Sequence, residues 1–237
     1  MTTASARALV VGGSSTIGRA IALELAGLGL DVTLWGRDPQ RLAEASGACA
    51  TVGVPSRWQQ VELTDRPALR RAAAEVSAGG GLAAVVWAAG VFDWAPADRA
   101  DPDRWAEVLD VNLTAAALTT RLLLPAVLAD PPGALVYLGS GAARQAFPDN
   151  AAYVASKHGL AGLAGGVWAD VRTRGVRVSL ISPGLVAAGA ALAAPVVQQH
   201  PDQVLQPAQV AAAVRFVLTF PGPGCPTEIV LEPPLTG

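Results

Sequence analysis

Apolar runs and helical patterns alternate along the chain, and this alternation indicates the fold class. Short apolar runs predict strands at residues 7–11, 31–35, 56–61, 82–87, 133–138, 176–181 and 227–231. Segments with apolar residues at helical spacing follow most of them, at residues 17–28, 66–77, 105–128, 151–173 and 207–218. Alternating strands and helices are typical of a parallel sheet covered on both faces. We therefore expect a Rossmann-type, doubly wound α/β fold with a parallel sheet of about seven strands.

The same pattern predicts a single domain over residues 1–237, because no linker and no internal repeat interrupts it. In a doubly wound sheet, ligands bind beyond the carboxyl ends of the strands, where the strand order reverses. Candidate functional residues should therefore follow the strand ends.

Composition narrows the class of protein. The chain is 51% hydrophobic and 15% charged with a net charge of −2, which argues for a globular fold and against nucleic-acid or anionic-lipid partners. The apolar stretch 180–197 is interrupted by Pro183, Gly184 and Pro195, and residues 1–9 lack the apolar core of a signal peptide. Cys49 and Cys225 are far apart, and only two histidines accompany them. We expect a cytoplasmic protein with reduced thiols, no metal site and no membrane partner.

A glycine-rich turn joins the first strand to the first helix. It reads Gly12-Gly13-Ser14-Ser15-Thr16-Ile17-Gly18. Glycines allow a tight turn and a close approach to a pyrophosphate, and the amides and dipole of the following helix favour its negative charge. Ser14 and Ser15 add hydroxyl donors. The alternative interpretation is an ordinary strand-to-helix turn.

Tyr153 and Lys157 form a second candidate feature. The chain has two tyrosines and one lysine, and this pair stands four residues apart in a predicted helix, on one face. A cation about 4 Å from a phenol, at an effective dielectric of about 20, is worth roughly 4 kcal/mol, or about 3 pKa units. We therefore expect Lys157 to lower the pKa of Tyr153 toward the working pH, where the phenol can exchange a proton. The alternative is a surface lysine beside a half-buried tyrosine.

The motifs, taken in order along nearly the whole chain, resemble the short-chain dehydrogenase/reductase family in its short single-domain branch. The glycine turn is similar to the family's Thr-Gly-x-x-x-Gly-x-Gly, and the segment after the fourth strand to its Asn-Asn-Ala-Gly. Further matches are a catalytic asparagine, a catalytic serine 13 residues before the tyrosine, the catalytic Tyr-x-x-x-Lys pair and a Pro-Gly turn. The residues concerned are Trp87-Ala88-Ala89-Gly90, Asn112, Ser140, Tyr153, Lys157 and Pro183-Gly184.

The resemblance implies an NADP(H)-dependent oxidoreductase, a carbonyl reductase or alcohol dehydrogenase acting on a small carbonyl or alcohol substrate. Tyr153 would exchange a proton with the substrate oxygen, and Ser140 would hydrogen-bond that oxygen. Lys157 would hold the nicotinamide ribose and lower the pKa of Tyr153, and Asn112 would hold a water that relays protons toward Lys157. As alternatives, Asn112 is a polar residue in a helix bend and Ser140 a turn serine. Beyond the turn, the implied cofactor contacts are Ala89, Gly90, Tyr153, Lys157, Pro183, Gly184 and Val186.

The end of the second strand bears on which nicotinamide cofactor is used. Family members that use NAD place an acidic residue where this chain has Gly36, and Arg37 follows it. Because an arginine pairs with a 2′-phosphate, we predict NADP(H). The alternative takes Asp38 as the acid that binds the ribose, about 20 residues past the turn. Asp38 is better explained as a helix N-cap before Pro39.

The resemblance also assigns surrounding parts of the site. Glu62 and Leu63 would line the adenine. Residues 185–206 would form a short apolar lid suited to a small or apolar substrate, with further walls at residues 91–94 and 145–147. Helices at 113–128 and 151–173 would form the contacts of a homotetramer or homodimer.

The chain departs from the family pattern at several positions. Thr16 replaces the middle glycine of the turn, and Trp87 and Ala88 replace two asparagines. Ala188 stands where a threonine often contacts the carboxamide, and the usual glycine-rich closing turn is missing from residues 227–234. Two alternatives stay open: a non-redox member that uses Tyr153 for isomerisation or cyclisation, and a cofactor-binding sensor.

Overall fold

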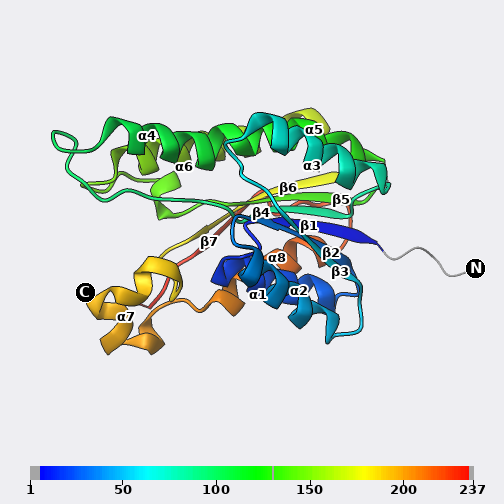
Figure 1. Cartoon of the computed structure of the whole chain (residues 1–237), viewed down its shortest axis with the longest axis horizontal. Coiled ribbons are helices and arrows are strands. Elements are labelled where there is room, and N and C mark those ends of the chain that lie inside the picture. Colours follow the sequence, from blue (N-terminus) through cyan, green and yellow to red (C-terminus); the bar gives the residue numbers. More distant parts are fainter. Residues whose placement is uncertain (1–5, 130, 235–237) are drawn as a thin grey trace, which may run out of the picture.

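A computed structural model describes residues 6–129 and 131–234 of the chain. Residues 1–5, 130 and 235–237 lie outside the described residues. The predicted domain 1–237 includes them, and residues 1–5 belong to the start of the chain considered above for a signal peptide. Seven strands form one parallel sheet in the order β3-β2-β1-β4-β5-β6-β7 (Figure 1), which confirms the predicted doubly wound fold. The strands are β1 Arg7–Val11, β2 Asp31–Gly36, β3 Ser56–Gln60, β4 Ala84–Trp87, β5 Gly133–Leu138, β6 Val176–Pro183 and β7 Glu228–Leu231.

Helices cover both faces of this sheet (Figure 1). One face packs against α1 Thr16–Gly27, α2 Pro39–Ala50 and α8 Pro207–Thr219. The other face packs against α3 Arg66–Ala78, α5 Ala115–Leu128 and α6 Ala151–Val171. On the same side, α4 Pro102–Leu109 packs against α6 rather than against the sheet. Between β6 and α8 lie the short helices η3 Gly189–Ala193, α7 Pro195–Gln199 and η4 Pro201–Gln203.

The strands are continuous apolar runs because both of their faces are buried. In β1, Leu9 and Val11 belong to the core beneath α3, α5 and α6, whereas Ala8 and Val10 belong to the core beneath α1 and α8. All four are fully buried. This two-sided burial is the reason a parallel sheet lacks the alternation of apolar and polar residues found in half-exposed strands.

The helix predicted at 105–128 starts earlier and is not regular throughout. Asp101 caps it by accepting a hydrogen bond from Asp103, and Pro102 occupies the first turn, so the helix begins there. A π-helical segment, η1 Asp110–Thr114, separates α4 from α5 and contains Asn112. The combined helix Pro102–Leu128 is long and apolar enough to cross a membrane, but half of its most apolar stretch is buried inside the fold. It packs as a core helix.

The strand order reverses beside β1, which pairs with β2 on one side and β4 on the other. The segments that follow β1 and β4 therefore meet at the carboxyl edge of the sheet. The amide of Ala88 donates to the carbonyl of Val11 over 2.8 Å and joins the two segments. A cleft opens at this edge.

Candidate active site

The cleft consists of two adjoining cavities. The larger has a volume of about 800 Å³ and extends over the ends of β4, β5 and β6 to the 185–194 segment. The smaller, of about 220 Å³, extends over the ends of β1 and β2. Both are lined by Ser15, Arg41 and residues 88–91, so they form one continuous groove. Its position is the one at which doubly wound folds bind ligands.

The glycine turn contributes lining residues to both cavities, and its shape requires glycine at two positions. Gly12 has φ +92°, and a Cβ there would lie 2.6 Å from the backbone nitrogen of Ala89. A Cβ on Gly18 would lie 2.1 Å from the carbonyl oxygen of Gly12. Gly18 lines neither cavity, so its contribution is this close packing of helix against turn.

The start of α1 presents unpaired amides to the groove. Ser15 is the N-cap: its Oγ donates to Gly12 O over 2.8 Å and accepts from Gly18 N over 2.9 Å. Within the described part of the chain, the amides of Thr16 and Ile17 have no hydrogen-bond partner, and both residues line the larger cavity. Two free amides at a helix N-terminus fit a pyrophosphate. The side chain of Thr16 is exposed, so this departure from the family leaves the turn open.

The predicted catalytic serine, tyrosine and lysine come together in the larger cavity. Ser140 follows β5, and its hydroxyl is hydrogen-bonded to the Tyr153 phenol. Lys157 Nζ lies 5.5 Å from the centre of the Tyr153 ring and donates to Leu138 O over 2.9 Å. The lysine side chain is buried beneath the tyrosine, and all three residues line the cavity.

The expectation that Lys157 lowers the pKa of Tyr153 does not hold in this structure. Burial raises the pKa of Tyr153, and the hydrogen bond from Ser140 opposes this shift only in part. Burial also lowers the pKa of Lys157 to about 8. Among the described residues, no carboxylate forms an ion pair with its ammonium group. Desolvation therefore dominates for both groups, and the phenol is held in its protonated, proton-donating form.

Asn112 contacts the loop after β4 and lines neither cavity. Its Oδ1 accepts from Val91 N, and its Nδ2 donates to Val91 O and to Ser156 Oγ, all within 3.0 Å. A Cβ on Gly90 would lie 3.4 Å from Asn112 Oδ1 and 3.6 Å from Lys157 Nζ, so the amide sits close to the lysine. Its contacts hold the loop, and the predicted water relay stays a prediction.

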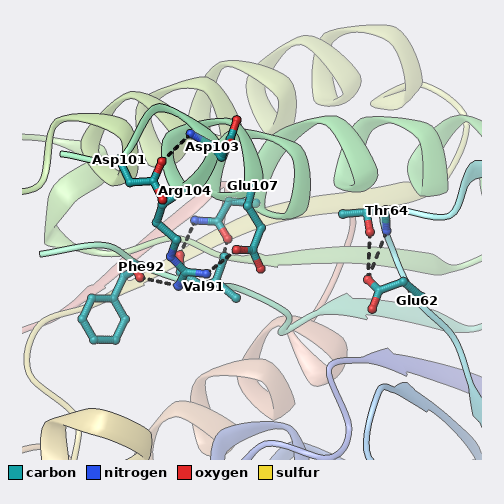
Figure 2. Close-up of polar contacts among 9 residues, drawn as sticks. Glu62, Thr64, Val91, Phe92, Asp101, Asp103, Arg104 and Glu107 are labelled. Atoms are coloured by element: carbon teal, nitrogen blue, oxygen red, sulfur yellow. Dashed lines mark hydrogen bonds and ion pairs between the residues drawn. The ribbon is translucent and has the colours of Figure 1, made fainter.

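The smaller cavity gathers the residues predicted for the adenosine end. Gly12, Ser14, Arg37, Glu62 and Leu63 all line it. The Glu62 carboxylate folds back on Thr64, accepting from its amide and hydroxyl (Figure 2).

Asp38 has the predicted capping role. Its Oδ1 accepts from the Arg41 amide over 3.0 Å, with Pro39 in the first turn, and it does not line the cavity. The N-cap interpretation is therefore confirmed. Sequence reasoning missed Arg41, whose side chain lines both cavities. Its spacing of four residues from Arg37 places both cations near the start of α2 and could have indicated it.

The remaining predicted walls are only partly in place. Pro183, Gly184 and Val186 line the larger cavity, as do Val91, Phe92, Trp94 and Phe147, but Asp93, Gln145 and Ala146 do not. From the predicted lid at 185–206, only part of residues 185–194 faces the cavity. The base of the lid is fixed, because Ala187 N donates to Leu205 O and Leu205 N donates to Leu185 O. Among the described residues, no group of three His, Cys, Asp or Glu side chains could hold a metal ion.

Comparison with known proteins agrees with this geometry. The family profile described as short chain dehydrogenase matches residues 6–199. The 3β-hydroxysteroid dehydrogenase of Mediterraneibacter gnavus is 32% identical over 74% of this chain and 64% of its own length. A crystal structure of a metagenomic short-chain oxidoreductase in complex with NADP is 30% identical, with a TM-score of 0.84 over 98% of both chains. A variant of the actinorhodin polyketide ketoreductase with NADPH is 25% identical, with a TM-score of 0.87 over 98% of this chain and 97% of that one.

The profile match covers most of the chain, and the solved structures share its whole architecture. Together with the order of motifs around the groove, these similarities show that the chain belongs to the short-chain dehydrogenase/reductase family.

Proposed function

We propose that the protein is an NADP(H)-dependent carbonyl reductase or alcohol dehydrogenase. The observation that carries this proposal is the meeting of Tyr153, Ser140 and Lys157 in the larger cavity, where it adjoins the glycine turn. The cavity is open to a small carbonyl or alcohol compound on the side of Phe92 and Phe147. The substrate oxygen would lie between the Ser140 and Tyr153 hydroxyls.

The groove fits a nicotinamide dinucleotide. The unpaired amides of Thr16 and Ile17 would hold the pyrophosphate, and Lys157 would hold the nicotinamide ribose. Pro183, Gly184 and Val186 would border the nicotinamide. The bound cofactor supplies or accepts the hydride.

Proton transfer is the task of the protein side chains. In the reducing direction, Tyr153 donates its phenolic proton to the carbonyl oxygen as the C–H bond forms on the adjacent carbon. Its raised pKa supports this direction, because the phenol is fully protonated at neutral pH. Ser140 would hold the same oxygen by a hydrogen bond and orient the carbonyl carbon.

Two arginines support a preference for NADP(H) over NAD(H). Arg37 and Arg41 both line the adenosine cavity, where a 2′-phosphate would carry about two negative charges. Glu62 lines the same cavity, but its carboxylate is engaged with Thr64. The NADP and NADPH complexes of the two structural relatives agree with this preference.

The first test is a titration with NADPH and, separately, NADH, followed by tryptophan fluorescence, with no substrate needed. We expect NADPH to bind at least tenfold more tightly. NADPH oxidation with a panel of ketones and aldehydes then tests the redox step. Conversion of substrate without net NADPH consumption would favour the non-redox alternative, and binding of neither nucleotide would contradict the whole proposal.

We also propose a cytoplasmic homotetramer or homodimer that associates through α5 and α6. Both helices carry partly buried apolar side chains at the edge of the core, among them Leu118 and Leu122 on α5 and Val167 and Trp168 on α6. A monomer measured by light scattering at micromolar concentration would contradict this assembly.

A further inference from the structure

Three aromatic side chains stand exposed around the larger cavity. Phe92, Trp94 and Phe147 have exposed fractions of 45%, 68% and 42%, and all three line it. Single exposed apolar residues are common, but several gathered around one cavity indicate a surface that a ligand or partner covers. We call these three residues the aromatic wall.

The part of the cavity next to the wall offers no charge. Among the described residues, its charged lining side chains are Lys157, beneath Tyr153, and Arg41, at the nucleotide end. The 185–194 segment adds mostly apolar lining residues, Leu185, Ala188 and Ala191 among them. Besides Ser140 and Tyr153, the polar side chain there is Asn150, whose amide donates to Pro148 O. A substrate carboxylate would lose its hydration and find no counter-ion.

Within the wall, Phe92 is held in a defined position relative to the reacting phenol. The Phe92 ring meets the Tyr153 ring edge to face, with centroids 6.5 Å apart and an interplanar angle of 78°. Arg104 on α4, paired with Glu107, donates to the Phe92 carbonyl over 2.7 Å (Figure 2). Asn112 is hydrogen-bonded to both backbone groups of Val91, the residue before Phe92. An aromatic group beside Phe92 would therefore contact a side chain already held in place.

From this geometry we propose that the substrate is an uncharged carbonyl compound that carries an aromatic ring. The ring packs against Phe92, Trp94 and Phe147 while the carbonyl oxygen meets Ser140 and Tyr153. This inference rests on the proposed function and specifies its substrate class. In reduction the carbonyl carbon gains a hydride from NADPH and the oxygen gains the Tyr153 proton, so ketone becomes alcohol and NADPH becomes NADP⁺. Oxo acids with a free carboxylate are excluded.

Two matched substrate pairs test the charge and the ring separately. Methyl 4-acetylbenzoate and 4-acetylbenzoate differ by one charge far from the reacting carbonyl. We expect a kcat/KM for NADPH-dependent reduction at least 100-fold higher for the ester. For the pair 4-phenyl-2-butanone and 4-cyclohexyl-2-butanone we expect about a fivefold preference for the phenyl compound, the size of a good aromatic contact. Equal values within either pair would overturn the proposal.

Substitutions in the aromatic wall show which side chains cause the preference for the phenyl compound. Trp94→Leu and Phe147→Leu should each reduce the phenyl preference to less than twofold. Phe216→Leu is the matched control, because Phe216 is 50% exposed on α8 and does not line the cavity. A phenyl preference that survives both wall substitutions would overturn the proposed contact.

A binding measurement separates this inference from the proposed function. Calorimetry with Tyr153→Phe in the presence of NADP⁺ reads substrate binding without turnover. We expect methyl 4-acetylbenzoate to bind and 4-acetylbenzoate to bind at least 30-fold more weakly. If the variant binds both compounds equally while the wild type oxidises NADPH with a carbonyl compound, the substrate class alone is contradicted. A protein that binds no nucleotide and reduces no carbonyl contradicts the proposed function, and the substrate class with it.

Discussion

Lys157 is buried and forms no ion pair with a carboxylate in the described part of the chain, so its titration differs from that of an ordinary lysine. Its pKa lies at about 8 against a reference value of 10.5, and burial is the cause. The difference of about 2.5 pKa units corresponds to roughly 3 kcal/mol of folding free energy. The folded state binds a proton less readily than the unfolded chain between these two values. The contribution of Lys157 to the free energy of unfolding is therefore lowest below pH 8 and increases as the pH rises toward 10.5.

Lys157 can be observed directly, because it is the only lysine in the chain. Incorporation of lysine labelled at the ε position gives a single side-chain resonance in the cofactor-free protein. We expect this resonance to shift with a midpoint near pH 8. A midpoint near the reference value of 10.5 would refute the burial argument, since a solvated ammonium is the only state that titrates there.

Urea unfolding of the wild type and of Lys157→Met gives the corresponding energy. Methionine has a similar length and removes the charge. The variant should therefore gain up to about 3 kcal/mol in free energy of unfolding at pH 7. The lost hydrogen bond to Leu138 reduces this gain by about 1 kcal/mol. The gap should narrow between pH 8 and 10.5. The difference between the two proteins cancels titrating groups outside the Tyr153–Lys157 pair, such as Cys49 and Tyr137, whose pKa values burial raises. A gap that stays constant over this range would contradict the assignment.

Four further predictions concern the groove. Gly18→Ala should weaken NADPH binding at least 100-fold, because its Cβ would overlap Gly12 O, whereas Gly27→Ala in the same helix meets open space and should leave the Kd unchanged; fluorescence titration compares them. Arg37→Ala and Arg41→Ala should each raise the Kd for NADPH about tenfold and that for NADH less than twofold, and equal losses for both nucleotides would remove the 2′-phosphate assignment. Tyr153→Phe should lower kcat by about 10²–10⁴-fold in a stopped assay while the NADPH Kd stays within threefold, and a retained kcat would assign the proton to another donor. Arg104→Met should lower kcat/KM for aromatic ketones about fivefold with nucleotide binding unchanged, because Phe92 loses its anchor; the exposed Arg99→Met is the control, and identical behaviour of the two would contradict a positioning role.

The fold and much of the site could be predicted from sequence because they depend on local signals. Strand and helix periodicity gave the order of elements, and the Asp38-Pro39 pair marked a helix start that the structure places there. The glycine turn is required by backbone contacts within a few residues, which only glycine permits. The order of the motifs predicted that Ser140, Tyr153 and Lys157 act together, and the structure places all three in one cavity.

Other properties depend on neighbours that are distant in sequence, and only the tertiary structure decides them. The spacing of Tyr153 and Lys157 suggested a lowered phenol pKa, but burial of the phenol raises it. The contacts of Asn112 with Val91 and Ser156, of Arg104 with Phe92, and of Arg41 with both cavities join residues from separate elements. Desolvation and cavity shape are sums over everything that packs around a group. The sequence by itself therefore determined which residues meet at the groove, and the packing determined their charge states and the surface they offer a substrate.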